Sequence, residues 1–432
     1  MKILPSEYEE RRIRILSMME NDSAMILYSG QPKVCSADED YPFEVNRNFY
    51  YLTGIEQEDS ALILVNSDGE QKEFLFISPF DERKEKWYGK RLTPEEASEI
   101  SGIRNVLLND STESKIQQIL SPDIQEYGAI NLFYLDLDKE IKVAEDTTTN
   151  DLSNTLSLAY PEVKILDAYP LITTLRLRKS ASEIALLKEA VEITKVGIYS
   201  IWKEMAPGKR EFEMANVFHH TINDLNAYQG TSFPTIMASG KNGACLHYPT
   251  PLSTLKDGDL LLMDLGARYG YYCGDISRTV PVNGKFTDFQ KQVYEIVLGA
   301  NKMVAALAKP GITIAELQNA TIDYLANGCL AIGLISSKDE ISKYYFHGVS
   351  HLIGLDTHDP YLSSSSRAYR DIKLEPGMVI SDEPGLYIAE KDMGIRIEDD
   401  LLITKDGCEV LSASIVKEIN EIEDRLAARE KK

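Results

Sequence analysis

DLLLMDLGARYGYYCGDISRTVPV, residues 259–282, is the stretch that decides the fold of the second part of this chain. An apolar run, a turn that contains glycine and a second β-rich run follow one another, which is the pattern of a β-hairpin. Asp264 and Asp275 lie eleven positions apart, and their midpoint falls between Tyr269 and Gly270. We therefore expect these two carboxylates to face each other on adjacent strands, with Cβ atoms about 5 Å apart.

A second hairpin repeats this arrangement in SDEPGLYIAEKDMGIRIEDDLLIT, residues 381–404. Glu383 and Glu398 lie fifteen positions apart, with a midpoint at Glu390 and Lys391 in a polar turn. Four carboxylates gathered in one core would be costly without a positive partner, so the pattern predicts divalent cations between them. The alternative for any single one of these residues is a solvated position on an exposed hairpin.

Three of the six histidines are crowded into HGVSHLIGLDTHD, residues 347–359. One imidazole added to four carboxylates gives an oxygen-rich donor set, which suits manganese, cobalt or iron(II) better than a thiolate-rich zinc site does. Carboxylates that can bridge further suggest two ions about 3.5–4 Å apart. Helical spacing alone would place His347 and His351 on one face of a helix.

The first 170 residues alternate strand-like runs with helical segments, which predicts an α/β domain around a central mixed sheet. The strand-like runs are AMILYSG, NFYYLTG, ALILVN, EFLFIS, NVLL and INLFYLDLD. A long amphipathic helix follows, opened by a capping-box pattern at Ser180 and Glu183. We place the boundary just before it, which gives an N-terminal domain over 1–171 and a C-terminal domain over 172–432.

The second part contains a weak internal repeat of its turn residues. Amphipathic helices end at Pro207-Gly208 and at Pro310-Gly311, and a glycine stands six residues before both Asp264 and Glu383. Two copies of helix, helix, strand and hairpin would produce this spacing. Chance coincidence of short turn motifs is the alternative.

The bulk composition narrows the class of protein. A formal charge of −22 over 432 residues argues against binding nucleic acid or an anionic membrane surface. The N-terminal segment mixes charges into every turn, so we expect neither a signal peptide nor a membrane anchor. Five cysteines without a close CxxC pair favour reduced thiols in a cytoplasmic protein over a disulfide frame or a structural zinc site.

Several motifs resemble those of one peptidase family. LLMDLGARYGYYCGDISRTVPV, HGVSHLIGLDTHD, EPGMVISDEPGLYI and GIRIEDDLLIT resemble the metal-site motifs of the metallopeptidases that include aminopeptidase P (Xaa-Pro aminopeptidase) and prolidase, relatives of methionine aminopeptidase. NRNFYYLTGIEQEDSALILV and KWYGKRLTPEEA resemble the N-terminal domain of aminopeptidase P. The resemblance implies an N-terminal α/β domain followed by a catalytic domain with the pita-bread α/β fold of creatinase and methionine aminopeptidase.

The resemblance also implies a dinuclear metal site. It makes Asp264 a ligand of one ion, His351 and Glu383 ligands of the other, and Asp275 and Glu398 the carboxylates that bridge them. Manganese is the expected metal, with cobalt, iron(II) or zinc as alternatives.

The resemblance assigns roles around the metals as well. His247 and His358 would hydrogen-bond the substrate and its tetrahedral oxyanion, and His347 would line the proline side of the site. Arg396, two residues before Glu398, would bind substrate or orient a carboxylate such as Asp264. Glu383 would also shuttle a proton from the attacking water to the leaving nitrogen. Tyr387 is as compatible with packing as with function.

The implied activity is hydrolysis of the N-terminal Xaa-Pro bond of peptides by a hydroxide that two divalent ions activate. The alternatives are a prolidase restricted to Xaa-Pro dipeptides, a non-catalytic binding or scaffold relative, and a creatine-type amidinohydrolase. After His358-Asp359 the family commonly continues with Val-Gly, but this chain has Pro360-Tyr361 and then a polar loop with four serines, Ser363 to Ser366. This departure puts the preferred peptide length in doubt. We expect a homo-oligomer, a dimer or tetramer, with Trp87 as a candidate contact.

Overall fold

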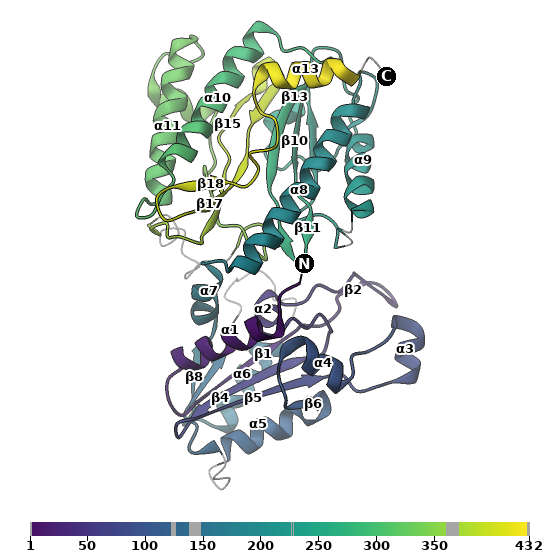
Figure 1. The fold of residues 1–432 in the computed structure, drawn as a ribbon, viewed down its shortest axis with the longest axis vertical. Helices are drawn as coiled ribbons and strands as arrows, with labels where there is room; N and C mark the ends of the chain where they lie inside the picture. The colour runs from purple at the N-terminus through teal and green to yellow at the C-terminus, as the bar shows by residue number, and fades with distance from the viewer. Residues whose placement is uncertain are drawn as a thin grey trace. The chain divides into compact units, whose positions relative to one another are not determined.

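The structure of the protein is a computed structural model that describes residues 2–121, 127–137, 148–225, 227, 229–359 and 371–429. The chain forms two compact units, Ile3–Leu175 and Arg176–Lys432. The predicted domain boundary at 171–172 falls inside helix α7, Tyr169–Arg176. Figure 1 shows that each unit combines strands with covering helices.

A six-stranded mixed sheet forms the centre of the N-terminal unit, as the sequence predicts. Its strand order is β6-β5-β4-β1-β7-β8, in which β1 runs antiparallel to β4 and parallel to β7. A separate two-stranded hairpin joins β2 and β3. The strands are β1 Ser23–Tyr28, β2 Val34–Ser36, β3 Glu39–Asp40, β4 Ala61–Ser67, β5 Glu70–Ile77, β6 Val106–Leu108, β7 Leu132–Leu135 and β8 Lys164–Asp167.

Helices cover this sheet and complete its hydrophobic core. The helices α5 and α6 bury Ile119 and Leu156 against apolar strand residues such as Ile63 and Phe76. Removing these side chains from water is the main force that stabilises the unit. The helices are α1 Pro5–Met18, α2 Arg47–Thr53, α3 Glu82–Tyr88, α4 Pro94–Ser101, α5 Thr112–Leu120 and α6 Thr148–Ala159.

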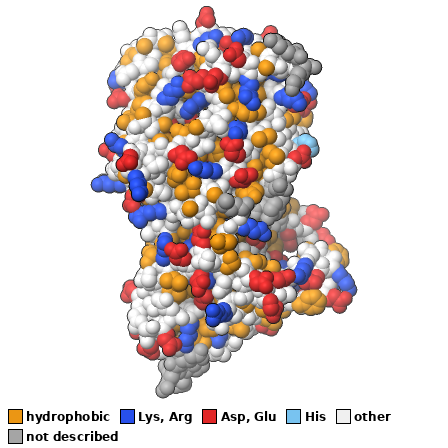
Figure 2. All heavy atoms as spheres, in the orientation of Figure 1, with side chains coloured by type: hydrophobic (Ala, Val, Ile, Leu, Met, Phe, Trp, Pro, Cys, Tyr) orange, Lys and Arg blue, Asp and Glu red, His pale blue; other side chains and the backbone are white. Residues whose placement is uncertain are grey.

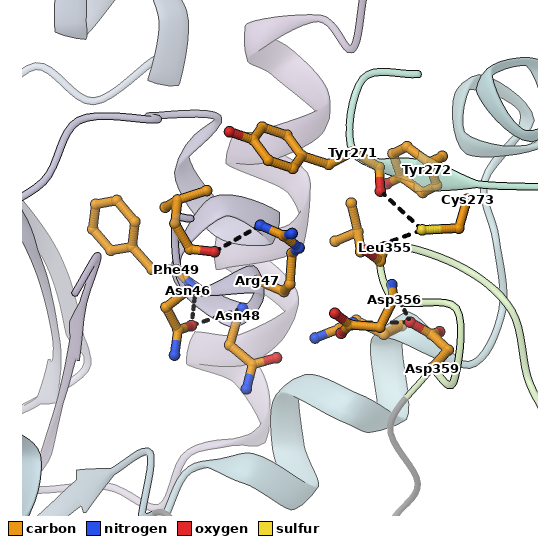
Figure 3. A network of polar contacts seen from close by, with 12 residues as sticks. Asn46, Arg47, Asn48, Phe49, Tyr271, Tyr272, Cys273, Leu355, Asp356 and Asp359 are labelled. Atoms are coloured by element: carbon orange, nitrogen blue, oxygen red, sulfur yellow. Dashed lines mark hydrogen bonds and ion pairs between the residues drawn. The ribbon is translucent and has the colours of Figure 1, made fainter. Parts of the chain in front are cut away.

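The segment NFYYLTG is a helix, so its prediction as a strand is wrong. The Asn46 side chain accepts hydrogen bonds from the backbone N–H groups of Asn48 and Phe49, which starts α2 (Figure 3). Gly54 ends the helix in the left-handed region at φ 69°. Every side chain from Asn48 to Thr53 is buried. The aromatic residues therefore reflect burial, and the caps decide the secondary structure.

Two pairs of long helices flank the strands of the second unit, with α8 beside α9 and α10 beside α11 (Figure 1). The predicted capping box of Ser180 and Glu183 is present at the start of α8. Matching boxes open α10 and α11. The helices are α8 Ala181–Glu204, α9 Glu211–Asp224, α10 Asp288–Leu307, α11 Ile314–Ala331 and α13 Ile419–Arg429.

The predicted internal repeat is confirmed, because each helix pair is followed by a three-stranded sheet and a small hairpin. The sheets have the orders β13-β10-β9 and β14-β17-β18, and the hairpins are β11-β12 and β15-β16. The strands are β9 Ile236–Ser239, β10 Leu260–Leu265, β11 Arg268–Tyr269, β12 Tyr272–Cys273, β13 Ile276–Pro281, β14 Val379–Asp382, β15 Gly385–Ile388, β16 Met393–Arg396, β17 Asp399–Ile403 and β18 Cys408–Val410. This is the α/β pita-bread architecture expected of the C-terminal domain.

Acidic and basic side chains are interspersed over the face seen in Figure 2. The excess of acidic residues is therefore not gathered into one patch on that face. Among the described residues, no helix has both the length and the apolar character needed to cross a membrane.

Candidate metal centre

The first hairpin carries Asp264 on β10 and Asp275 just before β13. The strands pair in a register that sets Asp264 opposite Ser277, so the prediction that the two aspartates face each other directly is wrong by two residues. The turn explains the difference. Gly270 and Tyr271 both adopt positive φ, 57° and 66°, which makes them the centre of a two-residue hairpin turn one position later than predicted.

Two glycines bring the strands of this hairpin close together between the aspartates. A Cβ atom on Gly266 would lie 1.7 Å from the carbonyl oxygen of Gly274, which no side chain could accept. The close approach therefore requires glycine. This close approach of Gly266 to Gly274 holds the segments that carry Asp264 and Asp275 against each other.

The second hairpin has the predicted register. Asp382 pairs with Asp399 on one side of the carboxylates, and Gly385 pairs with Arg396 on the other. Glu383 therefore lies opposite Glu398. The backbone N–H of Glu398 also donates a hydrogen bond of 3.0 Å to the carbonyl of Ser277, which joins the two hairpins.

His351 reaches this junction from a segment that is not a helix. The N–H groups of Ser381 and Glu383 donate to the carbonyls of His351 and Val349, so the segment runs beside β14 as an irregular strand. The helical interpretation of His347 and His351 is therefore wrong. The His351 Nδ1 faces the Leu352 carbonyl at 3.1 Å. Because a carbonyl only accepts, Nδ1 carries the proton and the lone pair of Nε2 is left for a metal.

The structure brings the predicted ligands together. One ligand atom from each of Asp275, His351 and Glu398 lies within 4.8 Å of the others. His351 Nε2 is 3.3 Å from Asp275 Oδ2 and 3.4 Å from Glu383 Oε1. Asp264 joins the group from β10 and is almost fully buried.

The electrostatics of the cluster fit a cation. Burial and the neighbouring carboxylates raise the pKa of Asp275 and of Glu398 well above their ordinary values. Burial likewise raises the pKa of Glu383. Asp264 Oδ1 is buried without a hydrogen-bond partner among the described residues. Buried carboxylates that repel one another and an oxygen without a donor are the features that a divalent ion would satisfy.

A buried arginine holds Asp264 in place. Arg396 Nη2 donates to Asp264 Oδ2 at 2.6 Å, which is the contact proposed from the sequence. Its Nε donates to Ser277 Oγ at 2.9 Å, and Ser277 Oγ in turn donates to Glu398 Oε2 at 2.8 Å. Sequence reasoning missed Ser277. The only available signal was its place two residues after Asp275, on the same face of the strand.

Arg396 also connects the cluster to His347. Its Nη1 donates to the Tyr387 hydroxyl at 3.0 Å, and that hydroxyl lies 2.8 Å from His347 Nε2. His347 Nδ1 faces the Gly348 carbonyl, so Nδ1 carries the proton and Nε2 accepts from Tyr387. Burial lowers the pKa of His347 to about 4, so this imidazole is neutral at pH 7. Tyr387 therefore belongs to the polar network, beyond its packing role.

The other two predicted histidines, His247 and His358, are both exposed. The ring centroid of His358 is 4.2 Å from that of His351, and the side chain is exposed. His247 is also exposed, on the loop after the 3₁₀ helix η3, Gly240–Ala244. Desolvation lowers the pKa of His358, which favours its neutral form.

Two further predictions concern regions away from the cluster. Trp87 is 75% exposed on α3 of the N-terminal unit, and Tyr88 beside it is 70% exposed. The four serines, Ser363 to Ser366, and Pro360-Tyr361 lie outside the described residues.

The sequence matches two family models, Metallopeptidase family M24 over residues 185–405 and Aminopeptidase P, N-terminal domain, over residues 8–126. The chain belongs to metallopeptidase family M24. It is similar to the Xaa-Pro aminopeptidase of Escherichia coli strain K12, with 34% identity over 100% of this chain and 99% of that protein. The Xaa-Pro aminopeptidase of Haemophilus influenzae is also 34% identical, over 98% of this chain and 97% of its own.

Solved structures of the family share the whole fold. A candidate aminopeptidase P from Bacillus anthracis has a TM-score of 0.94 at 41% identity, covering 99% of both chains. Aminopeptidase P from Escherichia coli with the inhibitor Pro-Leu has a TM-score of 0.91 at 33% identity, covering 100% of both. Both units of this chain therefore match these family members.

Proposed function

We propose that this protein is a metal-dependent Xaa-Pro aminopeptidase, which hydrolyses the peptide bond between the first residue and a proline at the second position. The observation that carries the proposal is the buried cluster of Asp275, His351 and Glu398, with Asp264 and Glu383 at its edges. It occurs in a chain similar over its full length to Xaa-Pro aminopeptidases, and not only over the catalytic domain. That extent favours an aminopeptidase over a prolidase.

Asp264, Asp275, His351, Glu383 and Glu398 would hold two divalent ions. We propose manganese, because four carboxylates and one imidazole form a hard, oxygen-rich donor set. Zinc is an alternative, since zinc-substituted aminopeptidase P of Escherichia coli has been solved with product. When bound, two such ions lower the pKa of a water molecule and polarise the scissile carbonyl.

Glu383 is the residue that we assign to proton transfer. Its side chain is 18% exposed, more than those of Asp275 and Asp264 in the same cluster. Its raised pKa brings the carboxyl closer to neutral pH, where a general acid and base works best. The Ser381 hydroxyl donates to Glu383 Oε1 at 3.3 Å and orients it. Glu383 would take the proton of the attacking water and deliver it to the leaving nitrogen.

Three histidines would surround the substrate. His247 and His358 are exposed beside the cluster, where N–H groups could donate to the oxygen of the tetrahedral intermediate. His347, held by Tyr387, would line the side of the site that receives proline. The free α-amine of the peptide would approach Asp264, whose other oxygen is fixed by Arg396. A peptide with a blocked N-terminus would therefore be a poor substrate.

We also propose that the enzyme works in the cytoplasm, where its five cysteines, none of which forms a disulfide, would stay reduced. Exposed large aromatic side chains such as Trp87 and Tyr88 favour self-association into a dimer or tetramer. Light scattering of the purified protein would measure the oligomeric state. A monomer that persists at high protein concentration would refute the proposed self-association.

The experiment that tests the function compares three substrates after metal removal and addition of manganese(II). We expect release of the first residue from the tripeptide Xaa-Pro-Yaa, slower hydrolysis of the dipeptide Xaa-Pro, and no cleavage of Xaa-Ala-Yaa. Activity confined to the dipeptide would make the protein a prolidase, and no activity on any substrate would favour a scaffold. Glu383→Gln should abolish turnover in protein that still binds metal. Unchanged turnover would exclude Glu383 as the proton shuttle.

A further inference from the structure

The loop Gly354–Asp359 has two neighbouring residues in opposite environments. His358 is exposed and its ring lies beside His351, whereas Asp359 is 1% exposed. Burying a carboxylate costs free energy unless the charged group is paired, so a buried aspartate is expected to have partners.

Asp359 is paired with two cations from the start of the same compact unit. Arg176 Nη2 lies 2.8 Å from Asp359 Oδ1, and Lys179 Nζ lies 3.0 Å from Asp359 Oδ2. The side chains of Arg176 and Lys179 are 3% and 1% exposed. Arg176 also binds Asp356 Oδ2 at 2.7 Å. Each carboxylate oxygen of Asp359 is therefore fixed by its own buried cation.

These ion pairs are strong enough to keep the carboxylate charged. Burial alone would raise the pKa of Asp359, but Lys179 and Arg176 overcome that effect and hold the pKa below its ordinary value. The group of Asp359, Arg176 and Lys179, which we call the buried triad, is therefore ionic at neutral pH. Its geometry is fixed at both oxygens.

Backbone hydrogen bonds connect the fixed Asp359 to the rest of the loop. The N–H of Asp359 donates to the Leu352 carbonyl at 2.9 Å, and the N–H of Gly354 donates to the Asp356 carbonyl at 3.0 Å. A Cβ atom on Gly354 would lie 2.6 Å from Asp359 Oδ2, so the loop closes tightly over the carboxylate.

A second anchor comes from the first hairpin. The N–H of Cys273 donates to the Gly354 carbonyl at 2.9 Å. Figure 3 shows the Cys273 sulfur between the carbonyls of Tyr271 and Leu355, with Asp356 and Asp359 further along the loop. The loop is thus held at its start by the hairpin and at its end by the buried triad. His358 is the residue directly before Asp359, which the buried triad holds.

We propose that the buried triad is a positioning device, in which Asp359, clamped by Arg176 and Lys179, fixes the loop so that His358 stays beside His351 and faces the substrate. A buried ion pair adds little net stability compared with apolar packing, but it can specify one geometry. The inference rests on the proposed function, because it needs His358 to act on the substrate. Asp359 itself is a positioning residue and does not contact the reacting atoms.

A double-mutant cycle tests whether the buried triad acts through His358. Lys179→Met, His358→Asn and the double variant would be compared with the wild type for kcat/KM on an Xaa-Pro-Yaa tripeptide, with manganese content measured for each. We expect Lys179→Met to lower kcat/KM by about 10–100-fold in the wild type, since a small misplacement of a catalytic group has an effect of that order. We expect almost no further loss in the His358→Asn background, and unchanged metal content.

A matched control separates positioning from stability. Glu423 is another buried carboxylate of this unit, held by Lys285 and Lys291, and lies in α13. Glu423→Gln should lower the melting temperature and leave kcat/KM unchanged. If Lys179→Met does not fold, Asp356→Asn removes one carboxylate from Arg176 at a position where the side chain is 40% exposed. Asp356→Asn should then lower kcat/KM in the wild type and cause almost no further loss in the His358→Asn background.

The outcomes are distinguishable. An equal fold-loss in both backgrounds, or no loss from Lys179→Met in the wild type, would overturn the inference. Full activity of His358→Asn would overturn it as well, because the triad would then position a histidine without a role. A wild-type protein inactive on the tripeptide would refute the proposed function, and the inference would fall with it.

Discussion

Ser277→Ala should weaken metal binding although Ser277 is not a proposed ligand. Its buried hydroxyl donates to Glu398 Oε2 at 2.8 Å and accepts from Arg396 Nε at 2.9 Å. Hydrogen bonds to charged groups contribute about 1.5–3 kcal/mol each. Arg396 keeps its hydrogen bonds to Asp264 and Tyr387, so we expect the free energy of unfolding of the metal-free protein to fall by about 2–4 kcal/mol.

The effect on the metal follows from the same contact. Glu398 must be ionised to bind a cation, and burial already raises its pKa. Loss of the Ser277 hydroxyl makes ionisation harder and frees the carboxylate to turn. Loss of such a partner of a ligand typically reduces metal affinity about 10–100-fold. Isothermal titration of the metal-free protein with manganese(II) would measure the change.

A buried serine in the other unit provides the control. The Ser101 hydroxyl donates to the Ala97 carbonyl at 2.7 Å and accepts from the Ile103 N–H at 3.1 Å. Ser101→Ala should therefore lower stability without changing manganese affinity. Wild-type affinity in Ser277→Ala would refute the reasoning, and so would an equal loss of affinity in both variants.

Three further predictions concern the C-terminal unit. Removal of metal by a chelator should abolish activity reversibly, and manganese(II) at 100 times its dissociation constant should raise the melting temperature by roughly 5–10 °C; an unchanged melting curve would argue against a site in the folded state. Gly394→Ala should lower kcat/KM on Xaa-Pro-Yaa at least about tenfold, because its Cβ would lie 1.8 Å from the Gly243 carbonyl of η3, the helix that leads to His247; Gly407→Ala, with nothing within 4 Å, should be neutral. Asp382→Val should stabilise the metal-free protein by about 1–3 kcal/mol at pH 7, since both carboxylate oxygens lack a partner among the described residues. Burial and, to a smaller extent, Asp399 raise the pKa of Asp382 above 3.8, so its charged carboxylate destabilises the folded state as pH rises above 3.8. Thermal melts should therefore show a larger stabilisation by Asp382→Val at pH 7 than at pH 4. A larger stabilisation at pH 4 would contradict a destabilising charge on Asp382.

The sequence predicts the features that depend on local pattern. The capping box of Ser180 and Glu183 and the register of Glu383 against Glu398 each follow from residue spacing within one element or one hairpin. The internal repeat follows from turn residues that recur at matched spacing. The metal-binding roles of the carboxylates and His351 stay predictions, although the structure places these side chains together.

Other features lie beyond such reasoning. The first hairpin shifts by two residues because Tyr271 takes a positive φ, which its residue type does not suggest. The contacts of Asp359 with Arg176 and Lys179 join positions about 180 residues apart, and no periodicity marks them. NFYYLTG is helical because of caps at its ends, which outweigh the strand preference of its aromatic residues.

The meeting of the two hairpins has a consequence for protein synthesis. Asp264 and Asp275 leave the ribosome long before Glu383 and Glu398, and the hydrogen bond from Glu398 to Ser277 that joins the two hairpins forms only when both are complete. Contacts between distant segments form late, because the long intervening chain must first be ordered. A nascent chain that ends before residue 351 therefore carries two of the five proposed donors and has little means of capturing metal. A peptidase built in this way is expected to stay inactive until almost its whole length has been translated and folded.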